Sequence, residues 1–220
     1  MYCLEWCCWI VIARNLTSPS SGQASNYSQL RHHKLPACHS GAALAIMMHE
    51  PPDADGEQVK EVYARFGLAV YFAQVLEHGI VNALVILDLI PSRRHLARSA
   101  DEWGSEVDAF MDRHFQAPMG RLMTNLRDIT QVDDDLEQLL GEALRKRNCL
   151  VHHFFRERAT EFMSSPGREQ MISEVDGCRD LFQCADKKLE ATVTPLGRKA
   201  GLTDELLARE YERMQMEAQR

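Results

Sequence analysis

The sequence predicts an all-α protein, a bundle of four to five helices with one very long first helix. Two observations support this fold class. Apolar residues recur every three or four positions along most of the chain after residue 53, as one face of an α-helix requires. No segment shows the sustained apolar–polar alternation that is typical of strands. A helical bundle is the simplest way for such segments to bury their apolar faces together.

The first helix is expected to run from Gln58 to Ile90. It is the most apolar segment of the chain, and Pro91 follows it directly. Because proline interrupts the hydrogen bonding of a helix interior, we expect the helix to end there. A segment of this length, at about 1.5 Å per residue, gives a helix of roughly 50 Å. Gly67 and Gly79 are expected positions for a bend.

Shorter helices are expected after it. Their predicted ranges are 99–116, 121–126, 134–163 and 168–191, and a last helix begins near Thr203, a typical N-cap residue. Asp133, Asp134 and Asp135 favour the positive end of the helix that they begin. Ser164–Gly167 and Thr194–Gly197 contain proline and glycine, and they are expected to break the helical pattern.

The composition divides the chain into three parts: residues 1–47, a helical bundle over 53–192, and a C-terminal helix over 193–220 that packs on the bundle or extends from it. Before Met47 there is one acidic residue, Glu5, and the stretch 17–27 is rich in Ser, Gly and Asn. Such composition favours disorder. Two interpretations stay open: residues 1–47 are a disordered extension, or they precede a natural start at Met47 or Met48.

Charge and cysteine usage limit the possible functions. The formal net charge of −7 argues against nucleic-acid binding over the whole surface, so such binding needs a local basic patch. Apolar runs fall short of the roughly 20 residues that span a bilayer, so no membrane association is expected. The 7 cysteines form no CxxC pair, which fits reduced thiols in the cytoplasm.

No metal or cofactor is expected either. The chain lacks a glycine-rich phosphate loop and the HExxH and GxSxG motifs. One N-terminal group contains metal-ligating residue types, but its spacing matches no common zinc pattern: His32, His33, Cys38 and His39.

The segment most suited to chemistry is Arg147-Asn148-Cys149-Leu150-Val151-His152. Arginine binds phosphate through a planar fork of donors, and histidine transfers protons near neutral pH. Asn148 and His152 are four residues apart and therefore share a helix face. Three basic neighbours are expected to bind the phosphates of RNA: Arg145, Lys146 and Arg156.

This segment resembles the RxxxxH signature of the HEPN superfamily of helical domains, in which a polar residue, often asparagine, follows the arginine. The resemblance covers roughly residues 53–191. It implies a homodimer that brings two motifs together and metal-independent cleavage of RNA by its own 2′-hydroxyl. His152 would then act as general base or acid, Arg147 would stabilise the charged phosphorane, and Asn148 would orient His152 or bind phosphate. HEPN toxins paired with nucleotidyltransferase antitoxins have a tyrosine where this chain has Phe154.

Polar residues on the first helix are candidates for a supporting role. Tyr71, Gln74, His78 and Asn82 recur at helical spacing, with Glu77 beside them. One interpretation is a solvated helix edge. In the other, the stripe faces the third helix and supports Arg147 and His152, with Glu77 pairing with Arg147.

Two further histidines have simpler interpretations. His153 is expected to be a flanking or interface residue, although a shift of one position would make it the functional imidazole. His114 is expected to lie on the surface or in a helix contact.

Two functions follow from these expectations. The first is a HEPN-like endoribonuclease of a toxin or defence system, with RNA as substrate and a cognate antitoxin as a candidate partner. The alternative is a non-catalytic helical module that dimerises, or that binds a nucleotide or a partner protein.

Overall fold

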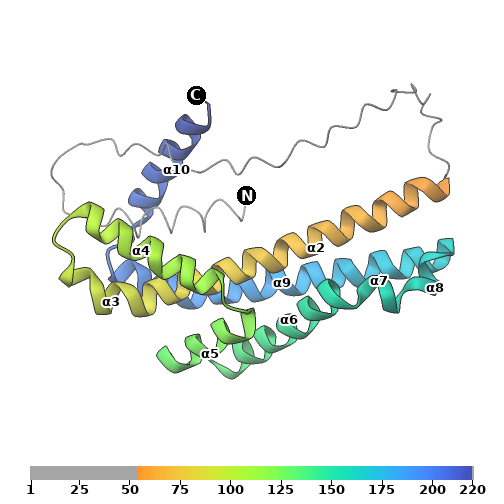
Figure 1. Cartoon of the computed structure of the whole chain (residues 1–220), viewed down its shortest axis with the longest axis horizontal. Coiled ribbons are helices and arrows are strands. Elements are labelled where there is room, and N and C mark those ends of the chain that lie inside the picture. The colour runs from red at the N-terminus through yellow and green to blue at the C-terminus, as the bar shows by residue number, and fades with distance from the viewer. Residues whose placement is uncertain (1–53, 220) are drawn as a thin grey trace, which may run out of the picture.

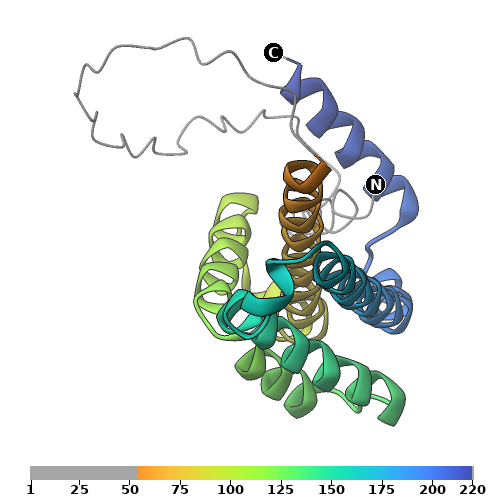
Figure 2. The same ribbon diagram turned by 90° about the vertical axis from the view of Figure 1, so that its right-hand side faces the viewer.

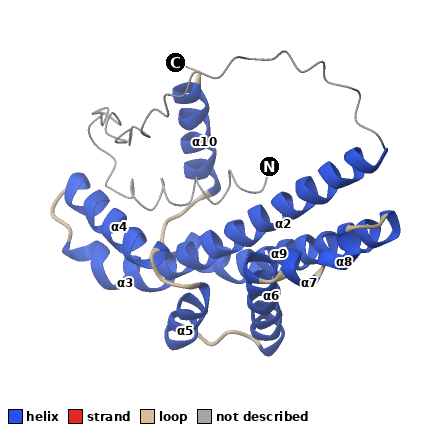
Figure 3. Cartoon of the chain, turned by 45° about the vertical axis from the view of Figure 1, so that its right-hand side comes forward, coloured by secondary structure: helices blue, strands red, loops and turns tan. Residues whose placement is uncertain are grey.

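The structure, a computed structural model, describes residues 54–219, and every regular element in that range is a helix (Figure 3). The predicted all-α fold class is therefore confirmed for this part of the chain. The two interpretations of residues 1–47 lie outside the described residues.

The first helix is longer than expected. It comprises α2 (Ala54–Leu84), a π-helical turn η1 (Val85–Leu89), α3 (Ile90–Arg93) and a 3₁₀ turn η2 (Arg94–Leu96). The predicted end at Ile90 is wrong. The N–H of Ile90 bonds to the carbonyl of Val85, Ile90 keeps a helical conformation, and α3 follows directly. Pro91 then lies in the first turn of α3, where a helix needs no N–H donor.

The next three helices agree with the predicted segments: α4 (Ala100–Phe115), α5 (Met119–Ile129) and α6, which begins at Asp134 and ends at His152. The Ser99 side chain caps α4 by accepting a hydrogen bond from Glu102 N–H, and Asp133 caps α6 by accepting one from Leu136 N–H. The Leu136 N–H bond is the main cause that lowers the pKa of Asp133.

The predicted continuation of α6 to Met163 is wrong. The helix ends at His152 because His153 leaves the helical conformation, and two single turns follow, α7 (Phe154–Glu157) and α8 (Ala159–Phe162). Aromatic packing accounts for the break. Phe154 and Phe155 lie against Phe66 of α2, with ring centroids 5.7 and 4.9 Å away. A straight helix would carry these rings away from α2.

The expected break at Thr194–Gly197 is also wrong. Helix α9 (Ser165–Lys199) continues through Pro195, so the boundary predicted at residue 193 falls inside a helix. Burial of Val193 and Gly197 holds this last turn against the bundle, which outweighs the hydrogen bond that proline lacks. The helix ends before Gly201, whose φ of 94° suits glycine. As predicted, Thr203 caps the last helix, α10 (Asp204–Ala218).

Helix α2 is the central element of the bundle. Figures 1 and 2 show it beside α9 along most of its length, with α4 on its other side and α5 and α6 across it. Contacts of Gln58 with Ser165 and of Arg65 with Asp176 show that α2 and α9 run parallel. The core has Trp103 and Phe182 among its largest buried side chains. Helix α10 projects from the end of α9 (Figure 1).

The helical stretch Ala54–Leu96 is long and apolar enough to cross a membrane by length and composition. Its most apolar window is 61% buried inside the bundle. A buried core helix meets the same two criteria, so this finding is weak evidence, and the expected lack of membrane association stays a prediction.

Candidate functional site

The predicted site lies at the C-terminal end of α6, where the helix passes α2. Leu140, Ala143 and Leu150 bury one face of α6 in the core and fix how the helix is rotated. As a result, Arg147 is half-buried, whereas Asn148 and His152 are exposed. These three residues therefore lie at the protein surface, on a helix whose opposite face is buried in the core.

Glu77 of α2 meets Arg147 at this surface. Its Oε1 lies 2.9 Å from Nε of Arg147, and both side chains are about three-quarters buried, with 22% and 27% of their surface exposed. The contact is an ion pair rather than an aligned hydrogen bond, because Oε1 is fully enclosed without an aligned donor. The predicted pairing of Glu77 with Arg147 is confirmed.

Asn148 has a different contact from the one expected. Its Oδ1 accepts a hydrogen bond of 3.2 Å from Nη1 of Arg147, and its role in orienting His152 or binding phosphate stays a prediction. The bond turns the guanidinium toward the face of α6 that carries Asn148 and His152. His152 makes no hydrogen bond or ion pair with any described residue. It is the last residue of α6.

The basic neighbours point in different directions. Arg145 is exposed and lies seven residues before His152, which places it on the same helix face. Lys146 lies near Cys178 of α9. Burial raises the pKa of the Cys178 thiol, and the positive charge of Lys146 partly opposes this rise. Nη1 of Arg145 lies 3.8 Å from the position that a Cβ atom on Gly141 would occupy, so its charge points toward the start of α6 and away from His152.

His153 and Arg156 contact each other beyond the end of α6. Nη2 of Arg156 lies 2.9 Å from Nδ1 of His153, and both side chains are exposed. The ring of His153 lies 6.1 Å from that of His152. This geometry agrees with a flanking position for His153.

The polar stripe on α2 divides into two parts. Tyr71, Gln74 and His78 are exposed, as a solvated edge would be, whereas Asn82 is buried. Five residues beyond Glu77, Asn82 is turned by about 140° around the helix axis, toward another face. The supporting role of Asn82 therefore stays a prediction.

Two histidines lie on α4 or against it. The His78 ring lies 4.5 Å from the Phe115 ring and keeps one edge exposed. Burial of the other side lowers the pKa of His78, and the charge of Glu77 opposes this effect. His114 is half-buried, and its Nδ1 lies 2.7 Å from the carbonyl oxygen of Phe110. His114 thus lies in a helix contact, as expected.

The helical pattern counts Val151 among the apolar positions of this helix, but Val151 lies between Asn148 and His152 and has 46% of its surface exposed. A single exposed apolar side chain is common at a protein surface, so Val151 by itself does not show that another molecule covers this face. The exposure of Val151 could be predicted, because residues three and four apart on a helix share a face.

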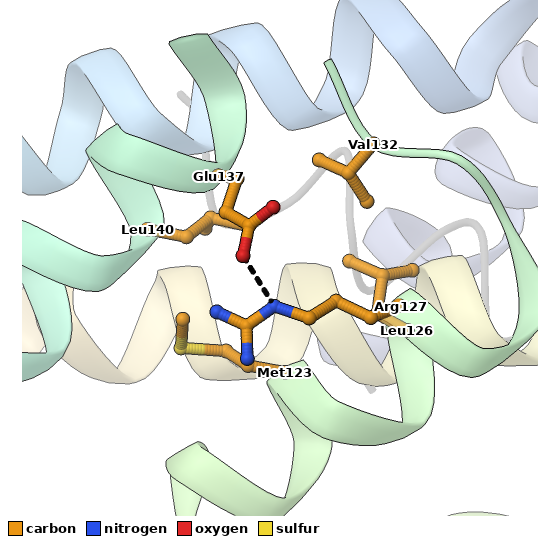
Figure 4. A pocket seen from close by; sticks show the side chains of 6 residues that line it. All are labelled: Met123, Leu126, Arg127, Val132, Glu137 and Leu140. Carbon is orange, nitrogen blue, oxygen red and sulfur yellow. Dashed lines mark ion pairs between the residues drawn. The ribbon is translucent and has the colours of Figure 1, made fainter. Parts of the chain in front are cut away.

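A hollow between α5 and α6 lies away from this site. Figure 4 shows its lining, where Arg127 of α5 reaches across to Glu137 of α6, with Nε and Oε1 2.9 Å apart. The cavity has a volume of about 10 Å³, room for about one water molecule, so it is too small for a substrate.

Within residues 54–219, no three His, Cys, Asp or Glu side chains are grouped so as to hold a metal ion. The N-terminal group that contains His32, His33, Cys38 and His39 lies outside the described residues.

Comparison with known protein families, curated proteins and solved structures finds no match for this chain. The resemblance to HEPN domains therefore rests on the Arg147–His152 motif and on the predicted order of helices.

Proposed function

We propose that the protein is a HEPN-like endoribonuclease that cleaves RNA without a metal ion. The observation that supports this function best is the hydrogen bond from Arg147 to Asn148. It directs the guanidinium toward the exposed face that carries His152, so an anion donor and a proton-transfer group adjoin the same open surface.

The proposed reaction needs a base and an acid. The base removes the proton of the RNA 2′-hydroxyl, and the oxygen attacks the adjacent phosphorus. The bond from phosphorus to the 5′-oxygen breaks, and the acid protonates that oxygen. The products are a 2′,3′-cyclic phosphate and a 5′-hydroxyl end. Arg147 stabilises the negative charge that develops on the phosphoryl oxygens.

One chain supplies a single exposed imidazole on this face of α6. A homodimer would bring two His152 side chains to one cleft, one as base and one as acid. The HEPN resemblance implies such an arrangement, in which a second chain would cover the exposed Val151 beside His152. As part of the same proposal, the protein acts in a toxin or defence system and has a cognate antitoxin as its partner.

A non-catalytic helical module is the second candidate, and one contact favours it. Glu77 already neutralises Arg147 within the chain, and such a pair needs no substrate to explain it. In that case the surface around Val151 would serve only to bind a second chain, a nucleotide or another protein.

Cleavage of a mixed-sequence RNA in the presence of EDTA distinguishes the two candidates. We expect wild type to cleave, and His152→Ala and Arg147→Lys to cleave at least about 100-fold more slowly, because each loses a group that acts in the transition state. The matched controls are His95→Ala, an exposed histidine on η2, and Arg127→Lys, which has a similar partner on α6. Both should cleave like wild type.

The ends of the products provide a second measurement. A cyclic phosphate and a 5′-hydroxyl are expected, since no water molecule attacks in the first step. Equal activity of wild type and His152→Ala, or no cleavage by wild type, would contradict the proposed ribonuclease and leave the binding module.

A further inference from the structure

We propose that Glu77 is a positioning residue, which fixes Arg147 for transition-state stabilisation at the expense of tight RNA binding. This inference rests on the proposed function. It assigns a role to the most enclosed acidic oxygen of the site and predicts an unusual kinetic result when that residue is changed.

The contacts of Arg147 show how the position would be fixed. Glu77 lies at Nε, 2.9 Å away, and Asn148 accepts from Nη1. These two contacts come from different helices and restrain the guanidinium plane at two points. The N–H groups that remain, on Nη1 and Nη2, form the edge that can bind two oxygens of a phosphate.

The contact with Glu77 has two opposing effects, one on RNA binding and one on stabilisation of the transition state. A carboxylate that contacts Arg147 weakens the attraction of this arginine for an RNA phosphate, because like charges repel. A fixed guanidinium, however, stabilises the transition state without reorganising at the moment of reaction. Glu77 should therefore raise the KM for RNA and raise kcat as well, two effects that a purely structural residue would not combine.

The burial of Glu77 agrees with a fixed position rather than a mobile surface pair. Its Oε1 is fully enclosed, and the Glu77 and Arg147 side chains are 22% and 27% exposed. The chain offers a matched comparison in Glu137 and Arg127, which have the same 2.9 Å Nε–Oε1 distance. These two side chains are 48% and 43% exposed and lie at the small cavity of Figure 4.

The test compares the kinetics of Glu77→Ala, Glu77→Gln and Glu137→Ala on the same RNA. We expect Glu77→Ala to lower kcat by about 10- to 100-fold, as small misplacements of a catalytic group do. Its KM should stay equal or fall. Glu77→Gln retains an oxygen that can accept from Arg147, so it should restore most of kcat and keep the low KM. Glu137→Ala should match wild type in both constants.

A second measurement needs no RNA cleavage. In protein with ¹⁵N-labelled arginine, Nη1 and Nη2 of Arg147 should give two separate signals, assigned through Arg147→Lys, because a restrained guanidinium does not rotate freely about its Nε–Cζ bond. The two signals should merge in Glu77→Ala and stay separate in Glu137→Ala. Thermal unfolding of each variant shows whether the fold is intact.

The outcomes separate this inference from the proposed function. If wild type cleaves RNA and Glu77→Ala keeps its kcat and KM, the positioning role is wrong and the ribonuclease stands. A parallel loss of kcat and rise of KM, not rescued by glutamine, would also overturn it. If wild type does not cleave, the ribonuclease is wrong, while merging of the Nη1 and Nη2 signals of Arg147 in Glu77→Ala would still support restraint of Arg147 by Glu77.

Discussion

The least exposed arginine side chain in the ion pairs of the described chain is Arg168, on α9. Its side chain is 6% exposed, and it donates to Gln58 of α2 and to the carbonyl oxygen of Phe162 in α8. It also pairs with Asp55 at the start of α2. One guanidinium thus ties three helices together at the end of the bundle where the chain returns from α8. A buried charge with several donors to place is costly unless each is satisfied.

Replacing Arg168 with methionine should lower the free energy of unfolding by about 2 kcal/mol. The methionine fills part of the space but leaves the Phe162 carbonyl without its donor and removes two further bonds. Urea unfolding followed by circular dichroism measures the change. Arg198→Met is the control, because Arg198 and its partner Asp204 are both exposed, and its midpoint should match wild type. Equal midpoints for both variants would contradict the role of Arg168.

At this scale the sequence predicted some contacts and not others. Helical spacing alone placed Glu77 within reach of Arg147, because each lies on the face that its helix turns toward the other. Spacing could not predict that Asn148 accepts from Arg147, since that depends on the side-chain rotamers of adjacent residues. The sequence pattern did not indicate the contacts of Arg168, because its partners lie 110 and six residues earlier in the chain.

Among the helices, α9 shows how position decides the effect of glycine. A Cβ atom built on Gly167 would lie 2.1 Å from the carbonyl oxygen of Glu161, because α8 crosses α9 at that point. A Cβ atom built on Gly177 would meet nothing within 4 Å. The same residue type therefore permits a close helix contact at one position and only weakens the helix at the other.

The two alanine variants should change stability in opposite directions. Gly167→Ala should lower the free energy of unfolding by about 2–3 kcal/mol, because backbone must move to accommodate the methyl group. Gly177→Ala should raise it by about 0.5–1 kcal/mol, the difference in helix propensity. Thermal unfolding can measure both, at about 2–4 °C per kcal/mol for a chain of this size. A stable Gly167→Ala variant would show that α8 does not cross α9 closely.

Element boundaries were predicted well where a capping side chain marks them and poorly where tertiary packing decides. Ser99, Asp133 and Thr203 each accept the hydrogen bond that a sequence reader expects. Pro195 is a strong helix breaker by itself, yet α9 continues past it because the last turn is packed against the bundle. Such packing is invisible in a local sequence pattern.

At the scale of the whole molecule, the exposed residues of α2 and α6 near His152 are the surface on which the proposed dimer would form. Contacts of Phe66 with Phe154 of α7 and of Glu77 with Arg147 of α6 show that α2 runs antiparallel to the segment formed by α6 and α7. Exposed residues of both helices lie between these two contacts. On α2 they carry no charge: Gly67, Leu68, Tyr71 and Gln74. On α6 the exposed residues are Asn148, Val151 and His152. Uncharged surface of this kind is typical of the centre of a protein–protein interface.

A second copy of the chain is therefore expected to cover Val151. Light scattering after size-exclusion chromatography should give wild type twice the chain mass of 25.1 kDa. Val151→Glu should give the chain mass and should also lose RNA cleavage, because it places a charge in an apolar contact and separates the two His152 side chains. The matched control is Leu96→Glu, which changes a residue that is 56% exposed on η2 and should remain dimeric and active. A wild-type chain that is monomeric and still cleaves RNA would show that one His152 suffices. A dimer that survives Val151→Glu would place the interface on another face of the bundle.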